Sequence, residues 1–231
     1  MRVSVAIFVP LFGGYDIFST YRLPFDYTGW IFTDNSIPYY QNENGWNVVD
    51  VKLNGTKWIS ASRLSAKYVK FVACFKYALN ASVLIFHDAN LEITKFPQTF
   101  IHTTGCSILW RDWPHKYDFT VPFWKKIFGM GKIKRQDRLE WEIEDMLTRR
   151  ANYTAQSRDN ILKWRDQLRE EHQSHPNKYV ESNFFIIYNR TASYLLMNWL
   201  YEKLHFIQRD QFLIPYVIEN RSDMCIRETL F

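Results

Sequence analysis

The sequence predicts an α/β protein in which helices flank a mostly parallel sheet. Its first half contains short segments rich in β-branched and aromatic residues, and a helical pattern separates the third of these from the fourth. The fourth, at residues 81–86, is a continuous run of apolar and small residues, which is typical of a strand buried on both faces of a parallel sheet. Strands and helices that alternate in this way imply crossover connections. A length of 231 residues suits one domain, residues 1–231, with a sizeable core.

Three strands and one helix are expected before the buried strand. The strands are predicted at residues 2–9, 30–35 and 46–51. The helix is predicted over residues 61–79, and Ser60 or Ser62 is expected to cap it. Three of its basic residues fit either a solvated face, which is the default expectation, or a phosphate site; they are Arg63, Lys67 and Lys70.

The second half begins with an aromatic segment and a charged helical excursion. Residues 101–117 mix aromatic and charged side chains, which fits a sugar or nucleotide pocket as well as a packed loop. Residues 132–175 are strongly charged, and we expect two helices there, broken near Asn152. The remaining predicted elements are a strand at residues 179–188, an amphipathic helix at 191–205 and an apolar helix that begins near Asp210. The tail beyond residue 219 has no informative pattern.

The composition is modestly basic, with a net charge of +5 and a pI near 9.0. This charge is compatible with anionic ligands such as nucleotides, and equally with a simple requirement for solubility. Acidic residues are interspersed among the basic ones, so we expect no binding to nucleic acid. The apolar segment at residues 3–12 contains Pro10 and is too short to cross a bilayer. We expect no transmembrane segment, although peripheral contact with a membrane surface is compatible with the charge.

The cysteines are the basis for an expectation about the compartment. Cys74, Cys106 and Cys225 are odd in number and lack metal-binding spacing, which favours a reducing environment and a cytoplasmic location. Asn-x-Ser/Thr sequons occur, for example at Asn54 and Asn189, and short patterns of this kind are expected by chance.

Polar side chains follow two of the predicted strands. Asp88 and Asn90 come directly after the buried strand, and Asp34 closes the second strand. Ligands of open α/β sheets bind beyond the carboxyl ends of the strands, so Asp88 and Asn90 are expected in the ligand crevice, and Asp34 lies at the carboxyl end of another strand. Carboxylate and amide oxygens suit Mg²⁺ or Mn²⁺. An ordinary turn after the strand is the alternative interpretation of Asp88 and Asn90.

The order of the motifs resembles a glycosyltransferase-like domain family with the GT-A fold, found in bacterial proteins and in plant Golgi proteins. Seven pieces that span nearly the whole chain carry the resemblance: Phe12–Asp16, Phe32–Asp34, Gly45-Trp46, Lys67-Tyr68, Asp88–Asn90, Glu181–Asn183 and Arg209–Gln211. The family's usual Trp-Ile-Asp-Gly at the metal strand is Phe86-His87-Asp88-Ala89 here, which retains the aspartate and loses the glycine.

The resemblance implies an enzyme of glycan or polysaccharide biosynthesis that moves a sugar from a nucleotide-sugar donor to a hydroxyl of a glycan or glycoconjugate acceptor. Residues 1–95 would bind the nucleotide-sugar, and residues 96–231 would form the acceptor side. Asp88 and Asn90 would hold Mn²⁺ or Mg²⁺, and Asp210 would be the catalytic base of an inverting reaction. The implied donor-site residues are Phe12, Gly13, Gly14, Tyr15, Asp16, Asp34, Lys67 and Arg209. The implied contacts to donor sugar or acceptor are Glu181, Asn183, Trp110 and Arg111. A non-catalytic sugar or nucleotide-sugar binding domain of the same fold is the alternative.

Overall fold

The computed structural model describes eleven parts of the chain, and the account below is confined to them: residues 4–14, 18, 20–34, 45–56, 59–91, 93, 105–112, 155–172, 180–207, 210–219 and 221–227.

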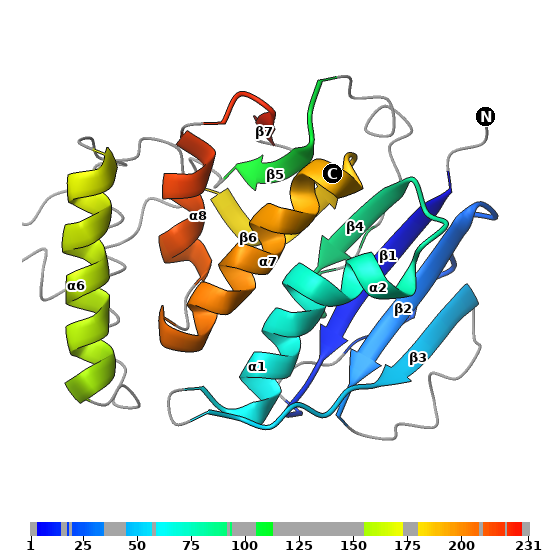
Figure 1. Cartoon of the computed structure of the whole chain (residues 1–231). Helices are drawn as coiled ribbons and strands as arrows, with labels where there is room; N and C mark the ends of the chain where they lie inside the picture. Colours follow the sequence, from blue (N-terminus) through cyan, green and yellow to red (C-terminus); the bar gives the residue numbers. More distant parts are fainter. Residues whose placement is uncertain are drawn as a thin grey trace, which may run out of the picture.

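Seven strands form one mixed sheet in the spatial order β3-β2-β1-β4-β6-β5-β7 (Figure 1). Strand β6 is antiparallel to its neighbours β4 and β5, and the other adjacent strands pair in parallel. The strands are β1 (Val5–Leu11), β2 (Tyr27–Thr33), β3 (Trp46–Asp50), β4 (Val83–His87), β5 (Ile108–Asp112), β6 (Val180–Ile187) and β7 (Met224–Arg227). The chain therefore has an α/β fold with a mostly parallel sheet, as the sequence predicts.

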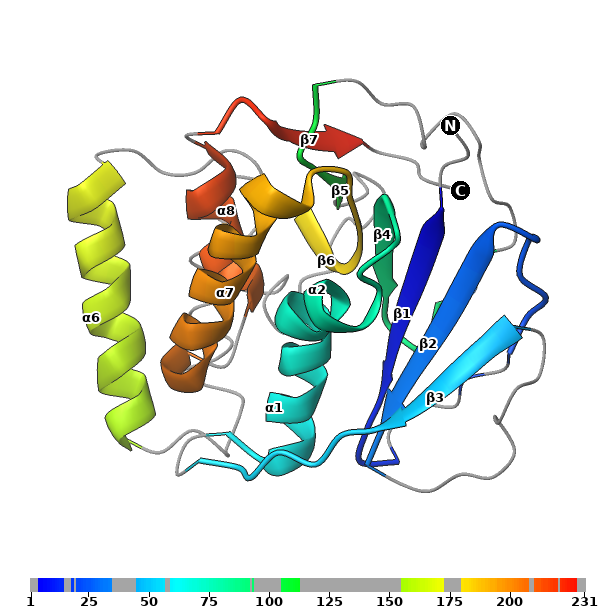
Figure 2. The same ribbon diagram turned by 45° about the vertical axis from the view of Figure 1, so that its right-hand side comes forward.

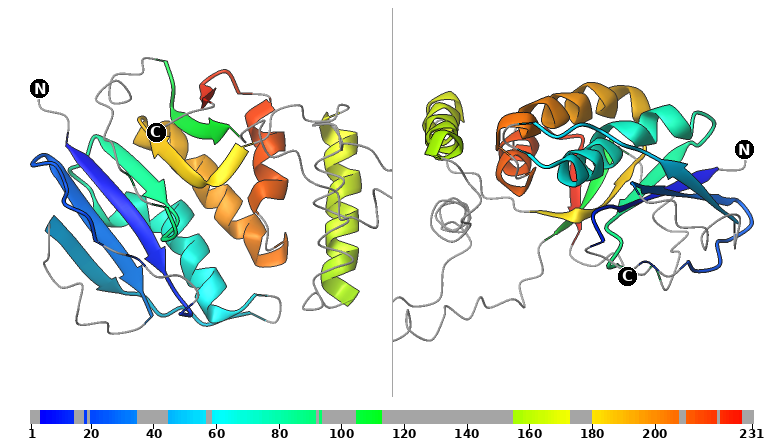
Figure 3. Two further views of the ribbon diagram at one scale, coloured as in Figure 1. Left: turned by 180° about the vertical axis from the view of Figure 1, so that it is seen from behind. Right: turned by 90° about the horizontal axis from the view of Figure 1, so that it is seen from below.

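The described helices lie on one side of this sheet. The view from below in Figure 3 shows α1, α7 and α8 over the same face. In Figures 1 and 2, α6 stands at the end of the helix layer, where Trp164 of α6 lies against Lys203 of α7. The helical segments are α1 (Ala61–Tyr68), the π-helical η3 (Val69–Ala73), α2 (Cys74–Tyr77), α6 (Ala155–His172), α7 (Arg190–Ile207) and α8 (Asp210–Glu219).

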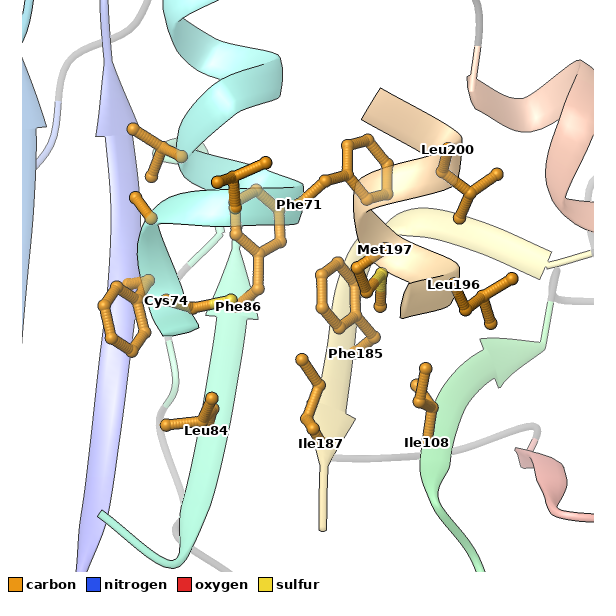
Figure 4. Close-up of a cluster of buried hydrophobic side chains, with 14 of the residues drawn as sticks. Phe71, Cys74, Leu84, Phe86, Ile108, Phe185, Ile187, Leu196, Met197 and Leu200 are labelled. Carbon is orange, nitrogen blue, oxygen red and sulfur yellow. The ribbon is translucent and has the colours of Figure 1, made fainter. Parts of the chain in front are cut away.

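Stacked aromatic rings build the core between the helices and the sheet. Phe86 of β4 and Phe185 of β6 are partners across the antiparallel pair, and their ring centroids are 5.0 Å apart. Phe71 of η3 stacks on Phe185 at 6.4 Å, and Met197 and Leu200 of α7 pack into the same layer (Figure 4). All five side chains are buried. Because each contributes roughly 1.5–3 kcal/mol by burial, this layer fixes η3 and α7 over the centre of the sheet.

Loop residues cover part of the opposite face of the sheet. The indole of Trp46 lies edge-on to the rings of Phe18 and Tyr21, and its Nε1 donates to the carbonyl oxygen of Tyr21 at 2.9 Å. A Cβ at Gly29 would overlap this indole, so glycine is required where β2 passes beside it. The loop after β1 is thereby held against β2 and β3.

His87, at the end of β4, is fully buried on the same face. Its Nδ1 lies 3.0 Å from the carbonyl oxygen of Asp88, and its Nε2 lies 2.9 Å from the hydroxyl of Tyr21. Since a carbonyl can only accept, Nδ1 carries the proton and the Tyr21 hydroxyl donates to Nε2. Burial lowers the pKa of His87 from 6.5 to about 4, so the imidazole is neutral at pH 7.

A disulfide joins the last two strands of the sheet. Cys106 precedes β5 and Cys225 lies in β7, and their Cα atoms are 5.8 Å apart. The third cysteine, Cys74, is buried and unpaired. The inference of a reducing, cytoplasmic location rested on cysteines that are odd in number and lack metal-binding spacing, and because two of them form a disulfide this argument loses its basis.

Most elements predicted from the sequence lie where they are expected. The predicted helix over residues 61–79 is present as the continuous run α1, η3 and α2, and the hydroxyl of Ser60 caps it by accepting from the amide of Arg63 at 3.4 Å. The second helix of the charged excursion is α6, whereas the first lies outside the described residues. Strands β5 and β7 were not predicted. β5 lies inside the aromatic segment, and β7 has only four residues at the sheet edge.

We expect the stability of the protein to fall as the pH decreases from about 6.5 to about 4. In this window the unfolded chain protonates His87 whereas the folded chain does not, so acid favours unfolding by up to about 3 kcal/mol. Urea unfolding of the wild type and of His87→Gln at several pH values measures this effect, and the variant should lose most of the pH slope. His205→Gln, which changes a half-buried histidine of α7, is the control and should keep the slope. An equal slope in wild type and His87→Gln would contradict the assignment.

Candidate functional site

The candidate site lies where β1, β2 and β4 end. Gly13 and Gly14 follow β1, with φ angles of 68° and 66° that non-glycine residues rarely adopt. The amide of Gly13 donates to Oδ1 of Asp34 at 3.3 Å, and the hydroxyl of Ser62 donates to Oδ2 of the same carboxylate at 3.1 Å. Asp34 therefore ties the glycine loop to the first turn of α1. The loop and Asp34 are neighbours because they follow the adjacent parallel strands β1 and β2.

A buried group of three charges lies on the helix side of this edge. Asp210, the first residue of α8, contacts Nζ of Lys67 through Oδ1 at 2.7 Å and Nζ of Lys70 through Oδ2 at 2.5 Å. The side chains of Lys70 and Asp210 are each 5% exposed, and that of Lys67 is 21% exposed. Lys67 and Lys70 are three residues apart along α1 and η3, so both ammonium groups reach the same carboxylate.

The electrostatics of these charges follow from burial and from the ion pairs. Burial alone would raise the pKa of Asp210, but the ammonium groups of Lys67 and Lys70 outweigh it and hold that pKa well below its usual range. Burial lowers the pKa of Lys67, while the carboxylates of Asp210 and Asp88 act in the opposite direction. The influence of Asp88 on Lys67 connects this buried group with the end of β4.

Asp88 and Asn183 are partners across strands β4 and β6. The pairs Phe86 with Phe185 and His87 with Phe184 set the register, and the amide of Asp88 donates to the carbonyl oxygen of Asn183 at 2.9 Å. Directly opposed residues of an antiparallel pair project to the same face, with Cβ atoms about 4.5–5.5 Å apart. The Oδ1 atom of Asn183 is buried, and the described residues offer it no hydrogen-bond partner. A carboxylate and an orphaned amide oxygen therefore adjoin each other at this edge.

These two oxygen donors fit a divalent cation that is also bound by phosphate. Mg²⁺ in nucleotide sites commonly takes one or two protein carboxylates together with substrate phosphates. Within the described ranges, no group of three or more His, Cys, Asp or Glu side chains is placed to hold a metal ion. With two protein oxygens as ligands, such a cation would take its remaining ligands from a bound phosphate or from water. Asn90 is exposed, two residues beyond Asp88 in a turn closed by the bond from the amide of Leu91 to the carbonyl of Asp88.

Several other predicted site residues lie elsewhere. Trp110 is 1% exposed and packs on Phe185 with ring centroids 4.8 Å apart, so its side chain belongs to the core and the expected substrate contact is wrong. The side chain of Phe12 is likewise buried in the core, which leaves only its backbone to approach a ligand. Arg111 is half-buried in β5, where it pairs with Glu181 in the strand register. Predicted residues outside the described ranges are Tyr15, Asp16 and Arg209.

Sequence reasoning missed the roles of Lys70 and Ser62. The default expectation for Lys70 was a solvated face, and its burial against Asp210 shows that this is wrong. Its ammonium group also lies 5.3 Å from the centroid of the Phe86 ring, in a cation–π contact. The spacing of Lys67 and Lys70 was visible in the sequence, but the partner carboxylate lies more than 140 residues away.

Comparisons with known proteins add no relatives. No protein-family model matches the sequence, and no curated protein matches it significantly. In the part of the chain that the structure covers, every helix is too short or too polar to cross a membrane.

We expect Asp210→Asn to destabilise the fold by about 3 kcal/mol, because two ammonium groups lose the carboxylate that compensates their burial. Urea unfolding at pH 7 measures the change. Asp50→Asn is the matched control, since Asp50 forms an exposed ion pair with Lys52 at 3.4 Å and should cost less than about 1 kcal/mol. Adding Lys70→Met to Asp210→Asn should restore part of the loss. Equal costs for the two single aspartate variants would contradict the structural role of the buried charges.

Proposed function

We propose that the protein is a glycosyltransferase with a GT-A-like fold, which transfers a sugar from a nucleotide-sugar donor to a hydroxyl of a glycan or glycoconjugate acceptor. The observation that carries the proposal is the pairing of Asp88 with Asn183 at one edge of the sheet, with Lys67 near enough for its charge to interact with that of Asp88. Two oxygen ligands within electrostatic reach of an ammonium group suit a metal-bound diphosphate. The seven motifs in order and the mostly parallel sheet also support this function.

The parts of the site have separate roles in this proposal. Gly13 and Gly14 allow the backbone to approach the nucleotide, and Asp34 holds their loop in place. Asp88 and Asn183 would hold Mn²⁺ or Mg²⁺, which stabilises the negative charge that develops on the leaving nucleoside diphosphate. Lys67, the more exposed of the two lysines, offsets charge on the same diphosphate.

We assign Asp210 a positioning role in place of the expected role as catalytic base. A general base works best when its pKa lies near the working pH. The carboxylate of Asp210 is occupied by two ammonium groups, and its pKa lies well below the usual range. Asp210 is thus a poor proton acceptor, whereas it orients Lys67 toward the edge where Asp88 lies.

A non-catalytic nucleotide-sugar binding domain is the second candidate. The feature that favours it is that the segment after β4 offers one carboxylate as a metal ligand, Asp88. The residue two positions later, Asn90, is an amide in place of a second carboxylate, and it is exposed. The two functions differ in turnover, because a transferase also hydrolyses its donor slowly in a metal-dependent manner. Release of free sugar from a donor that binds would select the transferase.

We expect one class of nucleotide-sugar to stabilise the protein only when Mn²⁺ or Mg²⁺ is present. A ligand at about a hundredfold its dissociation constant adds roughly 2.7 kcal/mol, which thermal unfolding detects. The panel comprises UDP-, GDP-, CMP- and dTDP-sugars, each with Mn²⁺, Mg²⁺ or EDTA. In Asp88→Asn the curves with metal and with EDTA should coincide, whereas Asp50→Asn, at the end of β3, should respond like the wild type. A metal response that survives in Asp88→Asn would remove Asp88 as a ligand.

We expect Lys67→Met to weaken binding of the corresponding nucleoside diphosphate by about 10- to 100-fold, the effect of losing one charge-assisted hydrogen bond of about 1.5–3 kcal/mol. Lys70 remains to pair with Asp210, so the fold should persist. Isothermal titration calorimetry with the diphosphate and Mn²⁺ measures the affinity. Lys76→Met, an exposed substitution on α2, is the control and should leave the affinity unchanged. Unaltered affinity in Lys67→Met would place the phosphates elsewhere.

A further inference from the structure

Single asparagine sequons are expected by chance, but their number in this chain exceeds that expectation. Five of the 14 asparagines begin an Asn-x-Ser/Thr sequence, whereas 26 serines and threonines among 231 residues would follow only one or two asparagines at random. None of the five has proline at the middle position, which would block modification. The five are Asn54, Asn80, Asn152, Asn189 and Asn220.

The three sequon asparagines that the structure describes are all exposed and lie between elements. Asn54 follows β3, Asn80 lies between α2 and β4, and Asn189 lies between β6 and α7. The loops after β3 and after α2 are at opposite ends of the sheet (Figure 1). Exposure on such connections is what attachment of a bulky, hydrophilic glycan requires.

The hydrogen bonds that Asn80 and Asn189 form with other described residues use atoms other than Nδ2. The carbonyl oxygen of Asn80 accepts from the hydroxyl of Ser4 at 2.7 Å, which anchors the backbone while the side chain stays at the surface. The Oδ1 atom of Asn189 accepts from the amide of Ala192 at 3.1 Å and so caps α7. A sugar on Nδ2 would leave this cap acceptor in place.

The disulfide is an independent indication of the compartment. Cys106 and Cys225 are brought together by parallel pairing of β5 and β7, in which Leu109 lies opposite Cys225. Structural disulfides form and persist in secretory and extracellular compartments, and thiols in the cytosol are kept reduced. These compartments are also where sequons meet the machinery that glycosylates them.

We propose that the chain matures in an oxidising secretory compartment and carries N-linked glycans on Asn54, Asn80 and Asn189. In each modification the Nδ2 atom of asparagine forms a bond to the anomeric carbon of a lipid-diphosphate-linked oligosaccharide. The bond from that carbon to the diphosphate oxygen breaks, the lipid diphosphate leaves with the electron pair, and the amide nitrogen loses one proton. The inference does not depend on the proposed transferase function.

The test is mass spectrometry of the full chain purified from the cells that encode it, with thiols alkylated at lysis. Peptide N-glycosidase in ¹⁸O-water converts each glycosylated asparagine to labelled aspartate, and we expect label at Asn54, Asn80 and Asn189. Under denaturing, non-reducing conditions we expect alkylation of Cys74 alone, with Cys106 and Cys225 protected. Unlabelled asparagines at all three positions, or three alkylated cysteines, would overturn the proposal.

Variants expressed in the same cells separate the sequons from one another. Thr56→Ala, Ser82→Ala and Thr191→Ala each break one sequon while the asparagine remains, so each should remove one glycan in a gel-shift assay. Thr191→Ala is preferred to replacing Asn189, because it keeps the cap of α7. Asn198→Gln, outside any sequon, is the control and should retain every glycan. An unchanged glycan count in all three sequon variants would contradict the assigned positions.

Discussion

The contact between Asp210 and the two lysines joins the two halves of the chain. Lys67 and Lys70 belong to the helix that follows β3, and Asp210 begins a helix near the end of the chain. Withdrawing such charges from water costs several kcal/mol for each ion, and only mutual pairing offsets the cost. The start of α8 is thus held against α1 and η3. The same contact holds the ammonium group of Lys67 on the helix side of the sheet, where its charge interacts with that of Asp88.

The antiparallel orientation of strand β6 also determines which residues lie at the site. In a fully parallel sheet, only residues that follow strands gather at the carboxyl edge. Because β6 runs the other way, its first residues lie at this edge, and Asn183 becomes the partner of Asp88. The chain can therefore place a residue from its second half beside the metal candidate from its first half. The long excursion that precedes β6 is compatible with this arrangement, because an antiparallel neighbour requires no particular crossover.

Local pattern was sufficient to predict the strands and helices that bury long apolar faces, including β4 and α7. It was also sufficient to place Asp34 and Asp88 at the same edge, because parallel strand ends are neighbours in any such sheet. The local pattern could not predict which residues pair when they lie far apart in the sequence. The burial of Lys70 depends on Asp210, and the pairing of Cys106 with Cys225 depends on the register of two short strands, neither of which was predicted. The predicted substrate contact of Trp110 was wrong for a related reason. An aromatic residue in a segment with many charged residues gives no sign that its strand lies inside the sheet.

The buried position of Cys74, the cysteine outside the disulfide, limits its reaction with that bond. Its side chain is 1% exposed, and burial raises the pKa of its thiol to about 12. Thiol–disulfide exchange proceeds through the thiolate, which is almost absent at neutral pH for such a thiol. In the folded protein the buried thiol of Cys74 is therefore a poor nucleophile toward the Cys106–Cys225 bond, so the packing of η3 and α2 protects the disulfide from exchange within the molecule.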